Sequence, residues 1–514
     1  MNLLLTLPLL PLAVLLWLAM SRRREVLATG WMIALVAAFP LAVAVLMAPL
    51  ALRLPDLLVQ GSAALVLDGS ARAALLLFSG TWLAAGLLMT HGGERHPSVF
   101  ALLVALGGAL TLALGQGGPL VYAGMLAVGY GLYGVVASER HYGWQRPGAV
   151  LIVLLVISDL MVFEVLLGDT MHPGSAAMTA LAVVALGLRA AAPPAHGWLP
   201  QLLQVASAPA ALLLVVVPAG AAWYGGVKLL PASGPDTAVL CLVLGVAGGT
   251  WALAGGLAQR DERASLGYAV AATSALLLLG LPAGAEGDAG LPWLVLAVLA
   301  ACAAQPLLRF LAHGWRHDLA VTLVLLVHGL AAGQAACQAG LQLPPGLALL
   351  PGLVALFATL ALTLAVRRVA AEPATPAHSI ALVFTPLALA LAGLGVGWWW
   401  SPPGFASVWT TPIAITLGLL AHRWLDRRRA APVAGDVLDP IESLTSRLVR
   451  VVGAACNEQL ARLRDRSQAR LLGLWNGPAW SRRMHRLDLS LRAWPATSLM
   501  MLAVALGAAY FLGR

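Results

Sequence analysis

GLRAAAPPAHGWLPQ, residues 187–201, brings an arginine, two adjacent prolines and a histidine into an otherwise apolar chain. Pro193 and Pro194 remove backbone donors and clash with the preceding helical turn, so the helix that carries Arg189 ends or bends there. A broken helix at membrane depth is tolerated where it lines a wet cavity or is buried in protein. Two interpretations stay open: an ion path that reaches the cytoplasmic side at His196, or a plain helix end at the cytoplasmic surface.

Apolar stretches of membrane-crossing length recur along the whole chain. Of its 514 residues, 60% are hydrophobic and 10% are charged, and about 20 apolar residues suffice to cross the hydrocarbon core. This pattern predicts an all-α polytopic membrane protein with about sixteen transmembrane helices. The predicted spans are 2–20, 28–51, 71–90, 97–115, 118–137, 147–168, 174–191, 208–230, 237–258, 264–283, 290–312, 319–339, 343–366, 378–400, 409–425 and 492–512.

Arginine is distributed unevenly between the loops. Arginines follow the odd-numbered spans, as in SRRR after the first, whereas loops after even-numbered spans hold almost none. Because cytoplasmic loops carry the excess of positive charge, this parity predicts a multi-pass protein of the bacterial cytoplasmic (inner) membrane with its N-terminus outside. The first span is expected to stay as an anchor, since no basic residue precedes it. The net charge of +9 is therefore a topology signal, and no nucleic-acid partner is expected.

Three regions are predicted from composition. Residues 1–430 form a transmembrane helical core, and residues 490–514 contain a C-terminal transmembrane anchor. Between them, residues 431–489 mix leucine and valine at helical spacing with many arginines, a pattern typical of an amphipathic segment on the cytoplasmic membrane surface. A tail helix that merely adheres to the membrane is the alternative. The four cysteines occur singly, and the chain has neither a P-loop nor a glycine fingerprint, so no metal and no cofactor is expected.

Ionisable residues inside the predicted spans are few. Each costs at least ~2.5 to 3.5 kcal/mol near the bilayer centre, so each needs a reason. Asp159 lies in mid-span, and a buried carboxylate either takes up a proton or pairs with a cation, for which Arg189 is the nearest candidate. Glu164, five residues on, faces a different side of the same helix. Lys228, the one lysine of the chain, ends a span, where its side chain can snorkel to the interface rather than carry protons.

The segment RAAAPPAHGWLP resembles a motif of the antiporter-like proton-translocating subunits of respiratory complex I, group 4 hydrogenases, multisubunit Na+/H+ antiporters and inorganic-carbon uptake complexes. The family motif is a lysine, six residues that include a proline, and then His-x-Trp-Leu-Pro. Arg189 falls on the lysine, Pro194 on the proline, and residues 196–200 match. SDLMVFEVLLG is similar to the family's Glu-Leu-Met segment, which places Asp159 at the glutamate that pairs with that lysine. The resemblance implies an inverted-repeat core, broken helices and an amphipathic segment before the last helix.

The second half of the chain departs from the family pattern. Ala301 and Gln305 stand where the family carries lysine or histidine, and LPPGLALLPG offers a helix break without a charge. His328 is the obvious ionisable group left in its span, although a lone histidine is more often a hydrogen-bonded packing residue. The resemblance is therefore to a divergent member.

The implied function is a proton-translocating subunit of a larger energy-converting membrane complex. Asp159 would alternate between an ion pair with Arg189 and a protonated state, while His196 delivers protons from the cytoplasm. At an effective dielectric constant of ~20 and a separation of ~4 Å such a pair is worth about 4 kcal/mol, so a partner that separated the groups could move a proton. The predicted proton pathway is Asp159, Glu164, Arg189, His196 and His328, with the helix break at Pro193 and Pro194.

Two alternatives stay open. Loss of the second-half charges favours a non-conducting scaffold of the same fold, whereas a cation/proton antiporter is expected to carry paired carboxylates. Expected partners are other membrane and peripheral subunits, protons, with Na+ as the alternative cargo, and lipid. No active site is expected in the chain itself, so a catalytic role is limited to membership of a translocating oxidoreductase or an inorganic-carbon uptake complex.

Overall fold

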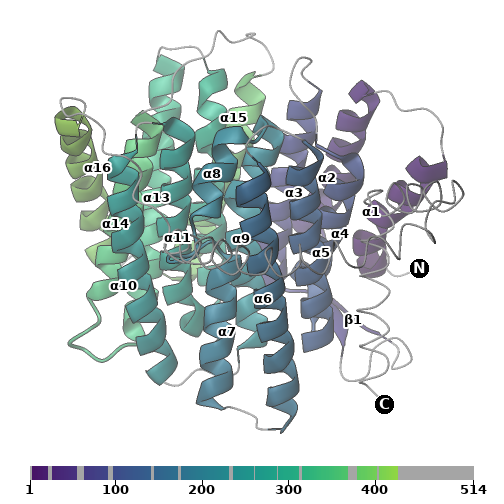
Figure 1. Ribbon diagram of the computed structural model, residues 1–514, viewed down its shortest axis with the longest axis horizontal. Helices are drawn as coiled ribbons and strands as arrows, with labels where there is room; N and C mark the ends of the chain where they lie inside the picture. Colours follow the sequence, from purple (N-terminus) through teal and green to yellow (C-terminus); the bar gives the residue numbers. More distant parts are fainter. Residues whose placement is uncertain are drawn as a thin grey trace, which may run out of the picture. The chain divides into compact units, whose positions relative to one another are not determined.

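A computed structural model describes twelve stretches of the chain. They are residues 3–20, 26–54, 63–90, 97–139, 144–171, 175–230, 235–259, 261–285, 288–311, 315–367, 379–401 and 405–425. The predicted amphipathic segment 431–489 and the predicted anchor 490–514 lie outside the described residues. Residues 1–436 cluster into one compact unit, whose described helices run alongside one another (Figure 1).

Helices dominate the described residues. Those that coincide with predicted spans are α1 (Leu3–Met20), α2 (Val26–Leu46), α3 (Gly69–Met89), α4 (Val99–Leu114), α5 (Gly118–Ser138), α6 (Gln145–Met171), α7 (Ala176–Arg189), α9 (Ala208–Leu229), α10 (Pro235–Ala258), α11 (Glu262–Ala285), α12 (Leu291–Ala304), α13 (Trp315–Leu341), α14 (Leu350–Arg367), α15 (Ser379–Trp400) and α16 (Phe405–Leu425). A further short helix, α8 (Trp198–Val205), follows the helix break, and the 3-10 helix η1 (Gln305–Phe310) follows α12. Ten of the described helices are long and apolar enough to cross a bilayer. The all-α prediction is confirmed, and the chain is a multi-pass membrane protein.

A small antiparallel sheet lies outside the predicted pattern. Its strands are β1 (Leu50–Arg53), β2 (Ala64–Leu67) and β3 (Gly115–Gln116), in the order β1-β2-β3. Leu50 pairs with Leu67 across the first ladder. The helix predicted over 28–51 ends instead at Leu46, because Pro49 lacks a backbone donor and disfavours helical geometry in the residue before it.

Prolines also move two boundaries in the second half. The helix predicted from residue 343 begins at Leu350, since Pro344 starts a turn in which its carbonyl accepts from Leu347 N at 2.8 Å. After α12, Pro306 lies inside the 3-10 helix η1, which carries Gln305 and Arg309. The break predicted in LPPGLALLPG therefore exists as a change of backbone geometry, whereas the change at Pro306 interrupts a span that was predicted to be continuous.

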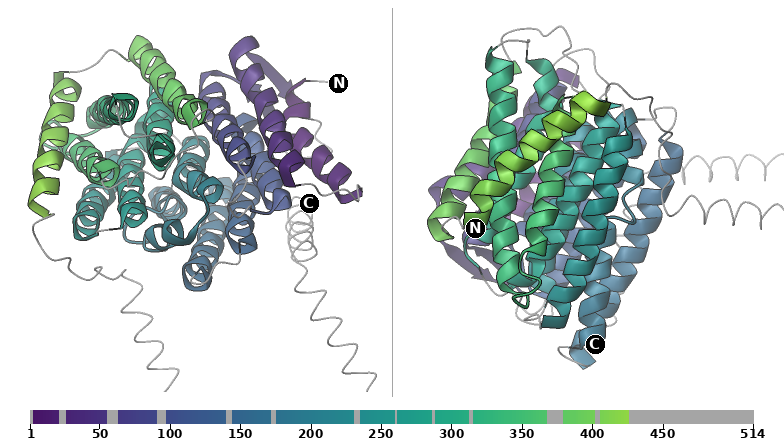
Figure 2. Two further views of the ribbon diagram at one scale, coloured as in Figure 1. Left: turned by 90° about the horizontal axis from the view of Figure 1, so that it is seen from above. Right: turned by 90° about the vertical axis from the view of Figure 1, so that its left-hand side faces the viewer.

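Two helices, α9 and α11, form the buried centre of the unit. The membrane-crossing segment of α11 is buried along its whole length, and that of α9 nearly so. Tyr224 of α9 is fully buried and donates to the carbonyl of Pro292 on α12 at 2.7 Å. The short helix α8 packs against α11, α6 and α9, so the helix break lies beside this centre. The left view of Figure 2 looks down on the helices from above.

Candidate functional site

A buried ion pair joins α6 to α7. Arg189, the last residue of α7, donates from Nη2 to Oδ1 of Asp159 on α6. The two residues are 3% and 4% exposed, which is rare for ionisable groups unless they are paired. The structure therefore brings together the carboxylate and the cation that the sequence analysis placed in neighbouring spans.

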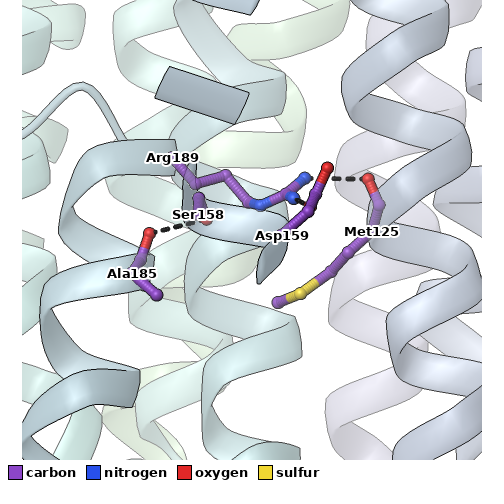
Figure 3. A network of polar contacts seen from close by, with 5 residues as sticks. All are labelled: Met125, Ser158, Asp159, Ala185 and Arg189. Atoms are coloured by element: carbon purple, nitrogen blue, oxygen red, sulfur yellow. Dashed lines mark hydrogen bonds and ion pairs between the residues drawn. The ribbon is translucent and has the colours of Figure 1, made fainter. Parts of the chain in front are cut away.

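The guanidinium of Arg189 also reaches a third helix. Its Nη1 donates to the backbone carbonyl of Met125 on α5 at 2.8 Å (Figure 3). One turn further along α5, a Cβ added to Gly129 would stand 3.0 Å from Nη1, tighter than ordinary side-chain contacts. Glycine at this position thus leaves room for the charged group, and Arg189 links α5, α6 and α7.

The pair is incompletely satisfied within the described residues. Oδ2 of Asp159 and Nε of Arg189 are buried and have no hydrogen-bond partner there. Beside them, Ser158 donates to the carbonyl of Ala185 at 2.9 Å and ties α6 to α7 without a charge. Unsatisfied buried polar groups are costly, so these two atoms leave hydrogen-bonding capacity open at the pair.

The break after Arg189 begins before the prolines. Ala191 has a positive φ of 56°, and Ala192 N donates to Gly187 O at 3.0 Å, which closes the helix with a Schellman-type turn. Glycine usually takes the left-handed position in this turn, because a Cβ there is unfavourable. The prolines then prevent the helix from resuming, and chain direction changes before α8.

His196 lies in this break and is buried. It is 1% exposed, and its ring meets the ring of Tyr268 on α11 edge-on, with 5.3 Å between ring centroids. Pro200 of α8 approaches α11 closely, because a Cβ added to Gly267 would lie 2.8 Å from Pro200 N. The break therefore packs against the buried centre of the protein through His196 and Pro200, while Pro194 stays exposed.

Two charged residues fix the ends of α8 and α9. Glu139, after α5, accepts from Ser207 N at 3.0 Å and from the Ser207 hydroxyl, at the N-terminus of α9. Arg263 of α11 donates to the carbonyl of Ala206 at 2.8 Å, at the C-terminus of α8. Negative charge at a helix N-terminus and positive charge at a C-terminus are both favourable.

The structure does not bring Glu164 to the ion pair. It lies on α6 and is exposed, because five residues of helix turn its direction roughly 140° away from that of Asp159. Lys228 is also elsewhere: its ammonium donates to the carbonyls of Leu112, Ala113 and Gly115 at 2.7, 2.7 and 3.0 Å. It caps the C-terminal end of α4, and all three of its protons are engaged, which argues against a proton carrier.

His328 forms a separate buried centre in the second half. It is fully buried on α13, with Nε2 3.3 Å from the hydroxyl of Thr273 and Nδ1 3.4 Å from that of Thr359. Gln305, which is 2% exposed, donates to Ala365 O at 3.4 Å and leaves its own Oε1 without a partner among the described residues. No hydrogen bond or ion pair between described residues joins His328 or Gln305 to Asp159.

Sequence reasoning did not identify several groups that position the site. The Met125 carbonyl is invisible in a sequence, since every residue has a carbonyl. Glu139 and Arg263 could have been noticed as charges next to helix ends, but their partners are backbone groups distant in sequence. Gly129 belongs to the glycine-rich stretch of α5, which was the available signal for a close approach.

Two proteins of known family resemble part of this chain in sequence. The chain is 27% identical over 271 residues to NADH-quinone oxidoreductase subunit N 1 of Streptomyces griseus, and 29% identical over 245 residues to NADH-quinone oxidoreductase subunit N of Mycobacterium sp. strain JLS. The predicted resemblance is confirmed. The matches cover 48% and 42% of this chain and 58% and 50% of the relatives, so the chain spans about half the length of each. None of the protein-family models searched matches the chain.

Solved structures show the same fold. A chain of the Mrp complex from Dietzia sp. DQ12-45-1b superposes with a TM-score of 0.59 at 15% identity, covering 92% of this chain and 60% of that one. A chain of respiratory complex I from Thermus thermophilus with bound aureothin gives 0.50 at 19% identity, covering 82% and 96%. Both are chains of multisubunit membrane complexes. The overall fold is therefore shared with such chains.

Proposed function

We propose that this chain is a proton-translocating, antiporter-like subunit of a larger energy-converting membrane complex. The observation that carries the proposal is the buried contact between Asp159 and Arg189 at the end of a broken helix. A carboxylate in this position has two states. It is either ionised and paired, or protonated and released from the guanidinium.

Arg189 acts as a fixed charge in this scheme, because a guanidinium practically does not lose its proton. The Met125 carbonyl holds it in place when the carboxylate becomes neutral. At an effective dielectric constant of ~20 and contact distance, the pair is worth about 4 kcal/mol. Any movement of α6 relative to α7 changes this energy and so changes the occupancy of the proton on Asp159.

His196 is proposed as the donor on the cytoplasmic side of the break, and His328 as a relay in the second half. A histidine ring can accept a proton at one nitrogen and donate one from the other, and the two hydroxyls around His328 give it hydrogen-bonded neighbours on both ring nitrogens. The proposal places the chain in the bacterial cytoplasmic membrane, with its N-terminus outside. Its partners are the other subunits of the complex, with protons as cargo and Na+ as the alternative.

A non-conducting scaffold is the second candidate, and one observation favours it. Gln305 and Ala301, which are both buried, replace the ionisable residues expected in the second half, and an amide or methyl group cannot relay a proton by changing charge. His328 would then be a packing residue held by two threonines.

Proton movement driven by the complete complex distinguishes the two candidates. Membrane vesicles that contain the complex are energised through its partner's reaction, and proton uptake is compared between the parent and Asp159→Asn. A translocating subunit requires the titratable group, so the ratio of protons moved to turnovers falls in the variant. An unchanged ratio would favour the scaffold.

A further inference from the structure

Helix α6 has a face that no described residue covers. The helix packs against α5, α7 and α8 (Figure 1), and the opposite side carries a stripe at helical spacing. We name this stripe the outer face of α6; it consists of Val153, Val156, Ile157, Leu160, Glu164 and Leu167. Leu160 is 64% exposed and Val153 is 54% exposed. Five of the six side chains are apolar, as expected of a surface inside a membrane.

Glu164 is the exception in this face. It is seven residues from Met171, the end of α6, which is about 10 Å along the axis. The helix has 27 residues and is roughly 40 Å long, against a hydrocarbon core of ~30 Å. With α6 centred in the bilayer, Glu164 therefore lies inside the hydrocarbon region.

The side chain of Glu164 does not lean towards the nearer membrane surface. The Cα–Cβ bond of a helical residue tilts towards the helix N-terminus. The nearer end of α6 is its C-terminus, so the carboxyl group starts out towards the membrane centre. Intramembrane carboxylates are rarely in contact with lipid and normally pair with another polar group.

We propose that the outer face of α6 is the docking surface for a second membrane subunit, which places a lysine or arginine side chain against Glu164. The proposal rests on the proposed function in one respect, that the chain works inside a complex. Charge complementarity selects the partner: a membrane helix that is apolar except for one basic residue at this depth satisfies both the five apolar side chains and the carboxylate. Neither lipid tails nor the same acidic face of a second copy supplies that cation.

Retention of companion subunits tests whether Glu164 pairs with a cation of the partner. A tagged full-length chain is extracted from its own membranes in a mild detergent, and the companion membrane subunits retained per chain are quantified. Glu164→Leu leaves the partner's cation unpaired at the interface, so we expect retention to fall tenfold or more, with a smaller loss for Glu164→Gln. The matched control is Asp236→Leu, which removes an exposed carboxylate at the start of α10, where water reaches it; retention should equal the parent's. Monodisperse elution of the Glu164→Leu chain alone excludes misfolding.

The access of oxygen to a spin label tests whether a partner covers the outer face of α6. A spin label at Leu160→Cys, in a chain without Cys337 and Cys456, is compared in the native complex and in the chain alone in vesicles. Oxygen access should be several-fold lower in the complex. Unchanged retention in Glu164→Leu, or equal oxygen access, overturns the proposal and leaves proton transport through Asp159 unaffected. Low oxygen access to the label in vesicles that hold only this chain at high density would identify a second copy as the occupant of the face, and this result would also overturn the proposal. If the parent chain retains no companions, both this interface and membership of a complex fail.

Discussion

Replacing Asp159 by asparagine should separate the structural role of the ion pair from its role in transport. The variant keeps an oxygen that can accept from Arg189, but it leaves the buried guanidinium without a counter-charge. Removing one partner of a buried pair destabilises proteins by about 3 to 5 kcal/mol. Because the hydrogen bond to the Met125 carbonyl survives, we expect the lower end, about 3 kcal/mol, and complete loss of proton movement.

The double variant Asp159→Leu, Arg189→Met supplies the decisive comparison. Apolar residues of similar volume often replace a buried ion pair without loss of stability. We therefore expect the thermal unfolding midpoint in detergent to return to that of the parent, while proton uptake by vesicles, followed with a pH-sensitive dye, stays at background. Recovery of stability without transport shows that transport needs the charged pair itself and not only its contribution to stability.

The matched control is Ser158→Ala. It removes the neutral hydrogen bond between α6 and α7 next to the pair, at a cost of about 1 kcal/mol, and should leave proton uptake at the parent's rate. The reasoning is refuted if the double variant moves protons at the parent's rate. It is equally refuted if Ser158→Ala abolishes transport, since the loss would then follow helix contact rather than charge.

Three further predictions concern the break and the second half. Ala191→Gly should raise stability by about 1 kcal/mol in thermal unfolding, because glycine adopts the positive φ freely; a decrease would contradict the Schellman-type end. Gly267→Ala should displace α8 from α11 through the clash with Pro200 and lower both stability and proton uptake, whereas Gly187→Ala should be tolerated, because its Cβ would make only an ordinary contact with Leu278 at 3.5 Å. His328→Gln should lower proton uptake at least tenfold with little change in unfolding midpoint; parent-like uptake would make it a packing residue.

The transmembrane architecture was predictable because lipid imposes a strong constraint. Each span must be long and apolar, so the positions of the helices follow from composition. The arginines of the loops alternate between the two sides, and this alternation gives a consistent count of spans. The partnership of Asp159 with Arg189 was predictable for a related reason, since a buried carboxylate needs a cation and few were present. Both arguments use the absence of alternatives rather than any detail of packing.

The features that could not be predicted depend on backbone groups and on which side of a helix faces its neighbours. The left-handed turn at Ala191, the carbonyls that hold Lys228 and the carbonyl that holds Arg189 carry no residue-specific signal. The hairpin of β1 and β2 replaces the end of a predicted helix, where Pro49 was the overlooked stop. Whether Glu164 faced inward or outward depended on which side of α6 meets its neighbours, and periodicity alone does not decide this.

Arg189 connects unequally to its two neighbours, through a peptide carbonyl on α5 and through an acid on α6. The first link is permanent, whereas the second weakens each time the acid becomes neutral. Proton arrival would therefore weaken the charged link to α6, which stays joined to α7 through the hydrogen bond from Ser158 to the Ala185 carbonyl, while the link to α5 is unchanged. A single helix that shifts with every proton is a mechanical output, and the same helix carries the acidic side chain that points away from the fold. A neighbour resting on that helix would sense the proton as displacement, without any ion crossing between the two proteins.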